Sequence, residues 1–174
     1  LKILIDEGQA VAQDPENLET RKNIMWTATM ALNGLIGTGV PQDWTTHMIG
    51  HELTSLHSID HARTLTILLP SVMRELKASK KEKLLQYARN VWNLTDTEQD
   101  DDATIETAIV YTENFFRDLG LPVSLADADL TEAAIDPIIK QLDAHKMVKL
   151  GEHGNNDLTV SRRILQRAVN SKAS

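Results

Sequence analysis

Four of the six histidines in this chain lie within one stretch of fifteen residues, and this stretch is the most informative part of the sequence. The four are His47, His51, His57 and His61. They form two pairs with a spacing of four residues, so the members of each pair share one face of a helix and lie close enough to bind one ion. Neutral imidazole suits Fe(II) and Zn(II), and it also transfers protons near neutral pH. The stretch therefore indicates a metal site.

A site shared by the outer histidines requires a chain reversal between them. On one unbroken helix, His47 and His61 would stand about 21 Å apart along the axis, at about 1.5 Å per residue. Ser58 and Asp60 belong to residue types that favour helix caps and local bonds between side chain and backbone. We therefore expect a break between Leu56 and Asp60, after which two antiparallel or crossed helices direct His47 and His61 at one point.

The sequence allows two other interpretations of the histidines. Any single one of them is more often an ordinary polar or half-buried helix residue than a ligand, but four together favour a site. Glu52 beside His51 suggests a zinc peptidase, yet H-E-x-x-H requires histidine where the chain has Ser55, and the inverted motif H-x-x-E-H also fails. We exclude a zinc peptidase of these types.

Composition narrows the class of protein further. The chain has 174 residues, enough for one domain with its own core, and we expect a single helical metal-binding domain over residues 1–174. It has no cysteine, which excludes disulfides and thiolate ligands and fits the cytoplasm as the expected location. The net charge of −7, with no basic stripe, makes nucleic acid an unexpected partner. No apolar stretch approaches the ~20 residues that span a membrane.

The periodicity of apolar residues predicts an all-α fold. Apolar residues recur at intervals of three and four in most segments, and alternating β-branched runs are nearly absent. We expect a multi-helix bundle of seven or eight helices, with a cap at Asp14, a kink at Pro70 and a possible division at Asp136-Pro137. The expected helices cover 2–13, the segment from Pro15 to the glycines at 34–39, 43–57, 60–79, 80–92, 103–119, 131–144 and 158–169. An acidic linker is expected over 95–102.

The histidine stretch resembles one in the iron-containing (group III) alcohol dehydrogenases. In the helical domain of that family, one histidine is followed four residues later by a second, after Gly, and ten residues beyond that by a third, before a small residue. Here these positions are His47, Gly50-His51 and His61-Ala62. Many relatives have Pro-His-Gly at the third histidine where this chain has Asp60-His61-Ala62. This departure bears on branch and substrate rather than on the ligand.

Flanking segments are similar to the butanol-dehydrogenase-like, NADPH-preferring branch of the same family, so the resemblance covers essentially the whole chain. These segments are Met25-Trp26, Ala31-Leu32-Asn33-Gly34-Leu35-Ile36-Gly37, Gly39-Val40-Pro41-Gln42-Asp43-Trp44, Leu68-Leu69-Pro70, Lys83-Leu84-Leu85-Gln86-Tyr87-Ala88, Phe115-Phe116 and Val160-Ser161-Arg162-Arg163-Ile164. The resemblance implies an all-α bundle like the C-terminal domain of the dehydroquinate synthase-like or iron-containing alcohol dehydrogenase fold.

The resemblance also implies a function and a site. It implies hydride transfer between NADP(H) and a small alcohol or aldehyde, with Fe(II) or Zn(II) as the metal and a homo-oligomer at full length. By this resemblance His47 and His61 bind the metal, and His51 is the catalytic and cofactor-binding residue near the nicotinamide. An Asp and a His that complete the site, and a nucleotide-binding domain, are expected before Leu1. This chain holds no Gly-rich dinucleotide turn. Because two ligands rarely hold a metal well, we expect the chain to have no dehydrogenase activity by itself.

The remaining three histidines are not expected to bind the ion. We expect His57 to be exposed or to neighbour the ion without binding it, and His145 and His153 to be incidental surface residues.

One alternative is a noncatalytic helical module that binds a partner and has structural histidines. A weaker alternative is a helical metal-dependent hydrolase, disfavoured because Asp60 precedes His61 instead of following it. The coding sequence before Leu1 distinguishes the noncatalytic module from a dehydrogenase, and a phosphoesterase assay tests the hydrolase.

Overall fold

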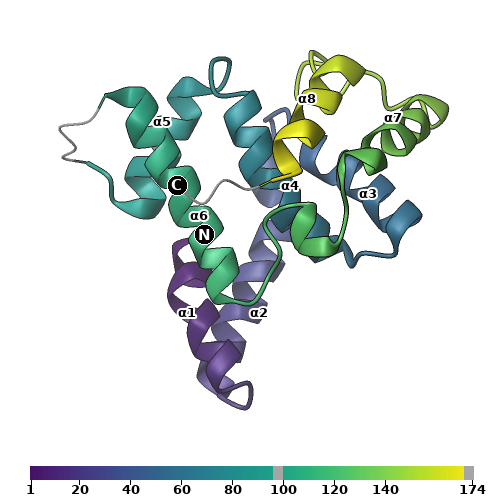
Figure 1. Cartoon of the computed structure of the whole chain (residues 1–174). Coiled ribbons are helices and arrows are strands. Elements are labelled where there is room, and N and C mark those ends of the chain that lie inside the picture. The colour runs from purple at the N-terminus through teal and green to yellow at the C-terminus, as the bar shows by residue number, and fades with distance from the viewer. Residues whose placement is uncertain (96–99, 171–174) are drawn as a thin grey trace. The chain divides into compact units, whose positions relative to one another are not determined.

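The structure, a computed structural model, describes residues 1–95 and 100–170. Within these residues it is all-α, as predicted, with eight α-helices and one isolated antiparallel bridge between Leu150 and Asn156. None of the described helices is both long and apolar enough to cross a bilayer. The helices are α1 (Lys2–Gln13), α2 (Leu18–Leu32), α3 (Thr45–His57), α4 (His61–Glu75), α5 (Lys81–Trp92), α6 (Asp101–Asp118), α7 (Ile135–Ala144) and α8 (Leu158–Ala168), with 3₁₀ turns at Leu35–Gly37, Ala126–Ala128 and Glu132–Ala134 (Figure 1).

The chain divides into two compact units, Leu1–Gln42 and Asp43–Ser174. The first unit is a hairpin in which α1 packs against α2, and Asn23 Nδ2 of α2 donates to Glu7 Oε1 of α1 over 2.7 Å. Gly8 and Thr20 are the buried residues of these two helices. The hairpin therefore has little core of its own. The expectation of one domain over residues 1–174 stays a prediction.

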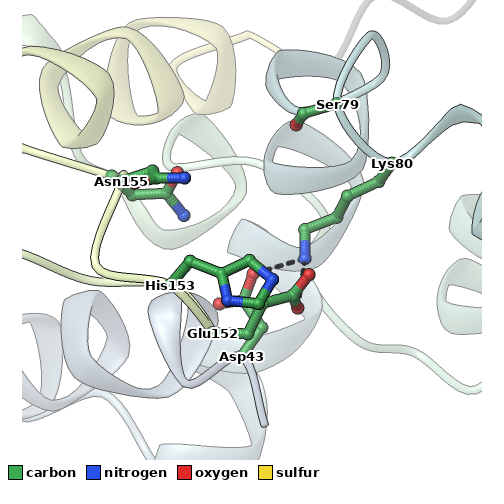
Figure 2. A pocket seen from close by; sticks show the side chains of 8 residues that line it. Asp43, Ser79, Lys80, Glu152, His153 and Asn155 are labelled. Atoms are coloured by element: carbon green, nitrogen blue, oxygen red, sulfur yellow. Dashed lines mark hydrogen bonds and ion pairs between the residues drawn. The ribbon is translucent and has the colours of Figure 1, made fainter. Parts of the chain in front are cut away.

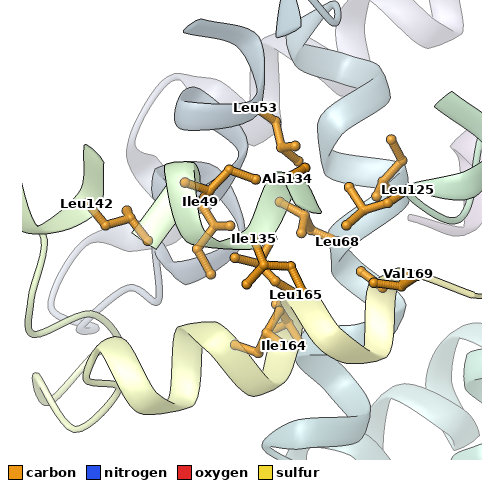
Figure 3. Packing of buried hydrophobic residues seen from close by; sticks show 14 of the residues in the cluster. Ile49, Leu53, Leu68, Leu125, Ala134, Ile135, Leu142, Ile164, Leu165 and Val169 are labelled. Carbon is orange, nitrogen blue, oxygen red and sulfur yellow. The ribbon is translucent and has the colours of Figure 1, made fainter. Parts of the chain in front are cut away.

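The core of the second unit is built from α3, α4, α7 and α8. Figure 3 shows apolar side chains of these helices meeting, joined by Leu125 from the segment between α6 and α7. The fully buried members are Ile49, Leu53, Ile67, Leu68, Leu125, Ile138, Leu142, Ile164 and Leu165. Full burial of one such side chain contributes about 1.5–3 kcal/mol, so this cluster dominates the stability of the unit. Leu84, Ile105 and Ile109 form a smaller cluster between α5 and α6.

The start of α2 differs from the sequence prediction. The helix was expected to begin at Pro15 with Asp14 as cap, but it begins at Leu18, and the side chain of Asn17 accepts from Thr20 N at 3.2 Å. Asp14 Oδ1 instead accepts from Glu16 N, at 3.3 Å, within the connecting turn. Asn and Asp are about equally good caps, so residue type alone did not separate the two positions.

Two further boundaries differ for identifiable reasons. Pro137 does not divide a helix, because it lies in the first turn of α7, where no internal hydrogen bond needs its missing N–H. The last residues of the expected acidic linker belong instead to the start of α6. There Asp100 Oδ1 accepts from Ala103 N at 2.8 Å. Acidic residues at a helix N-terminus complement its dipole. Residues 96–99 of that linker lie outside the described residues. Helix α4 runs through Pro70 to Glu75.

Candidate metal centre

A sharp chain reversal between α3 and α4 builds the site. Helix α3 ends at His57, Ser58 takes a left-handed conformation with φ 55°, and α4 begins at His61. The predicted break is therefore confirmed. The two helices pack directly against each other, and Gly50 allows this close approach, since a Cβ at Gly50 would lie 2.7 Å from Oγ1 of Thr64 on α4.

Three imidazoles converge across this helix pair. His47, His51 and His61 each present a ring nitrogen, and these nitrogens all lie within 4.8 Å of one another. His47 Nδ1 lies 3.1 Å from His61 Nε2, and the ring centroids of His51 and His61 are 4.8 Å apart. The structure thus brings together the three histidines that the sequence singled out, and their individual roles stay predictions.

The geometry of the cluster fits a single transition-metal ion. Two nitrogens bound to one ion at about 2.0–2.1 Å, with bond angles between those of octahedral and tetrahedral sites, lie about 2.8–3.4 Å apart. The distance between His47 Nδ1 and His61 Nε2 falls in this interval. The same distance also suits a hydrogen bond between two rings, with either nitrogen as donor according to the tautomer. Nδ1 of His61 is buried and has no hydrogen-bond partner among the described residues.

The surroundings of His47 favour its neutral ring. Burial lowers the pKa of His47, and the neighbouring His61 and His51 lower it further. A neutral imidazole is the form that binds metal. His47 and His61 are half-buried, whereas His51 is exposed. The arrangement therefore offers nitrogen donors with one side open to a small molecule.

A polar pocket of about 250 Å³ lies beside the beginning of α3 (Figure 2). Lys80 Nζ lies 2.8 Å from both Asp43 Oδ2 and Glu152 Oε2. Although burial acts in the opposite direction, hydrogen bonds with these carboxylates raise the pKa of Lys80. Burial opposes the ionisation of Asp43, but hydrogen bonds from Lys80 and Thr45 outweigh burial and lower the pKa of Asp43. This ion-pair network ties the segment before α3 to the 151–156 turn.

The other three histidines lie outside the cluster. His57 is half-buried, and its Nε2 atom is buried without a hydrogen-bond partner. His153 is exposed and lines the polar pocket. His145 is exposed, as expected, but it is not an incidental residue, because it contacts the buried carboxylate of Glu52. The sequence offered one sign of this pair. Glu52 is a carboxylate on the apolar side of its helix, which also carries Met48, Ile49 and Leu53.

Comparison with known families shows to which family the chain is related. Residues 1–154 match the model of the Fe-containing alcohol dehydrogenase family, C-terminal part. The chain belongs to the iron-containing alcohol dehydrogenase family. It is 51% identical over 168 residues to the NADPH-dependent aldehyde reductase YqhD of Escherichia coli, covering 97% of this chain and 43% of that protein. It is 33% identical over 143 residues to NADH-dependent butanol dehydrogenase B of Clostridium acetobutylicum, covering 81% of this chain and 36% of that one.

Solved structures of the family share the fold. The substrate- and cofactor-free form of the aldehyde reductase YqhD from Escherichia coli matches with a TM-score of 0.93 and 50% identity, over 96% of this chain and 43% of that one. NADH-dependent butanol dehydrogenase A from Thermotoga maritima matches with a TM-score of 0.89 and 26% identity, over 97% of this chain and 44% of that one. The chain thus spans less than half the length of these relatives and has the fold of their C-terminal domains.

Proposed function

We propose that this chain is the metal-binding C-terminal part of an alcohol dehydrogenase or aldehyde reductase that transfers hydride between NADP(H) and a small alcohol or aldehyde. The observation that carries the proposal is the convergence of His47 and His61, 3.1 Å apart at their ring nitrogens, from two helices of the family's domain. The 51% identity to an NADPH-dependent aldehyde reductase supports the choice of cofactor and substrate class. The nucleotide-binding part would precede these residues in the complete enzyme.

The three histidines take different roles in this proposal. His47 and His61 would hold Fe(II) or Zn(II), which when bound supplies a Lewis acid for the carbonyl oxygen of the substrate. His51 is exposed at the edge of the cluster, where it would orient the nicotinamide and give or take a proton at a ring nitrogen. A further Asp and His from the upstream part would complete the ligand set. The cytoplasmic location and the homo-oligomeric state of the full-length protein stay predictions.

Metal binding by the chain itself tests the site. Titration with Co(II) or Zn(II) should show one ion per chain, bound weakly because the ligand set is incomplete. His47→Ala and His61→Ala should each abolish this binding, while the exposed His153→Ala should leave it unchanged. Binding that survives His61→Ala would contradict the ligand assignment.

Activity tests the proposed reaction. With Fe(II) or Zn(II), NADPH and butanal, the isolated chain should give no change in nicotinamide absorbance. Joined to the upstream coding sequence, the protein should oxidise NADPH, and His61→Ala should abolish that turnover while the exposed His153→Ala retains it. Turnover by the isolated chain that His61→Ala destroys would overturn the expectation that the upstream part is required.

A further inference from the structure

We propose that Asn156 is a positioning residue for the metal centre, acting through Thr45 to fix the direction of His47. This inference rests on the proposed function, because it concerns a ligand of the proposed metal site. Asn156 Nδ2 donates to Thr45 Oγ1 over 2.9 Å, although 111 residues separate them in sequence. Thr45 is the first residue of α3 and is fully buried, and His47 follows two residues later.

The turn that contains Asn156 is shaped to hold its amide in one orientation. Asn156 N donates to Leu150 O at 3.0 Å, and Leu150 N donates to Asn156 O at 2.8 Å, which closes the 151–156 turn. Gly151 has φ +86°, and a Cβ there would lie 2.7 Å from Asn156 Nδ2. The turn therefore needs glycine for its backbone conformation and also for the space that the amide occupies.

Thr45 is held at a second atom as well. Its backbone N–H donates to Asp43 Oδ1 at 2.8 Å, and Asp43 is itself paired with Lys80, which also pairs with Glu152 of the same turn (Figure 2). The ion pairs are partly solvated and contribute little by themselves. The hydrogen bond between Thr45 and Asn156 is buried, so breaking it leaves polar groups without partners. We therefore assign the larger effect to Asn156.

This anchoring acts on His47 more than on the other two histidines. The first turn of a helix lacks internal partners for its N–H groups and frays unless side chains hold it. His47 lies in that first turn, where Trp44 also contacts its ring edge-on at a centroid distance of 5.1 Å. His51 lies one turn further on, between the buried residues Ile49 and Leu53. Loss of the anchor should therefore widen the orientations of His47 and weaken its approach to His61.

The test compares three threonine variants, with Co(II) as the probe. Thr45→Val keeps the shape of the side chain but removes the hydroxyl, whereas Thr45→Ser keeps the hydroxyl. Thr112→Val is the matched control, because Thr112 is a buried threonine of α6 whose Oγ1 lies 2.7 Å from Tyr87 OH and which has no part in the cluster. Co(II) affinity, visible absorption bands and melting temperature are measured for each variant.

Thr45→Val should weaken Co(II) binding by about 10-fold to 100-fold, as loss of a group that orients a ligand does, and shift the visible bands. Thr45→Ser should retain both properties, and Thr112→Val should lower the melting temperature without moving the bands. Asn156→Ala serves as a second variant with the same expected effect, should Thr45→Val fail to fold. Wild-type affinity and bands in either folded variant would overturn the positioning role.

A metal-independent measurement separates this inference from the proposed function. The imidazole NMR signals of His47 in the metal-free chain should change in Thr45→Val and remain in Thr45→Ser, while those of His153 stay constant. If the wild-type chain binds no Co(II), the proposed metal site of the chain fails. The NMR comparison then still decides whether Asn156 and Thr45 position His47, and unchanged His47 signals in Thr45→Val would refute it.

Discussion

Nδ1 of His145 lies 2.7 Å from Oε1 of Glu52, and this contact joins the end of α7 to the buried side of α3. Glu52 is only 5% exposed, and its other oxygen, Oε2, is buried without a hydrogen-bond partner. A buried carboxylate is costly unless a partner compensates it. His145 therefore stabilises a carboxylate that lies directly beside the histidine cluster in sequence.

Removal of His145 should destabilise the fold through this carboxylate. His145→Ala should lower the free energy of unfolding by about 1–3 kcal/mol, since it leaves Glu52 without its one side-chain partner in the described structure. In a Glu52→Leu background the same substitution should cost much less, because both partners are then absent. Urea denaturation of the two single variants and the double variant measures this coupling. Equal costs of His145→Ala in both backgrounds would contradict it.

Gly50 should not tolerate a methyl group, although it lies inside a helix. Helix propensity alone favours alanine over glycine by about 1 kcal/mol. The new Cβ would, however, lie 2.7 Å from Thr64 Oγ1, which is fixed by its hydrogen bond to His61 O at 2.7 Å. We expect Gly50→Ala to destabilise by about 1–3 kcal/mol through overpacking and to weaken Co(II) binding.

A second substitution tests the cause of that effect. Thr64→Ala removes the hydroxyl that the new methyl group would meet. In this background Gly50→Ala should be neutral or stabilising, as helix propensity predicts. Thermal unfolding of the four proteins shows whether the sign reverses, and a cost that persists without the hydroxyl would rule out this steric explanation.

The buried ion pair between α4 and α6 should contribute strongly to stability. Arg74 contacts both oxygens of Glu113, at 2.6 and 3.1 Å, and Glu113 is 2% exposed. Glu113→Ala would leave the guanidinium without its buried partner and should cost about 3–5 kcal/mol. Glu106, whose side chain is 45% exposed, also pairs with Arg74, and Glu106→Ala should cost at most about 1 kcal/mol. Urea denaturation of the two variants would refute the ranking if their costs were equal.

Acid should destabilise the fold through Glu75. Burial opposes ionisation of this carboxyl, but its hydrogen bonds with Arg163 and Arg167 of α8 outweigh burial and lower its pKa below the ordinary 4.5. A carboxyl whose pKa is lower in the folded state stabilises that state above the unfolded pKa, and this contribution is lost as pH falls through the folded pKa. The stability difference between wild type and Glu75→Gln should therefore be constant above about pH 5 and shrink at lower pH.

The control for this pH dependence is a protein that lacks both arginines. In an Arg163→Ala and Arg167→Ala background, Glu75 has lost the partners that lower its pKa, so Glu75→Gln should no longer change the slope of stability against pH in the same interval. Denaturation curves over the range in which carboxyls titrate, about pH 3 to pH 7, supply the measurement. A slope difference that persists without the arginines would assign the effect to another group.

Sequence patterns predicted the helices and the reversal more readily than the contacts between distant segments. Helical periodicity identified the all-α fold, and the cap-forming residues Ser58 and Asp60 located the break before α4. The resemblance to a family then selected three of the six histidines, and these three converge. Local signals failed where two residues were equally suited to one role, as with Asn17 and Asp14 at the start of α2.

Pairs distant in sequence left no local signal that identifies both partners. Asn156 lies in a turn-rich segment that predicts a loop, but nothing in that segment indicates that its amide reaches Thr45. The contact between His145 and Glu52 spans 93 residues and depends on how α7 packs against α3. Such contacts depend on the packing of the apolar core, which sets the positions of the helices that carry the two residues.

The division of the chain after Gln42 leaves every candidate ligand on one side. His47, His51 and His61 all belong to the unit that begins at Asp43, and the hairpin of α1 and α2 contributes none of the three. Substitutions in the hairpin thus remove no imidazole of the cluster. A shorter chain that begins at Asp43 would therefore still carry all three imidazoles.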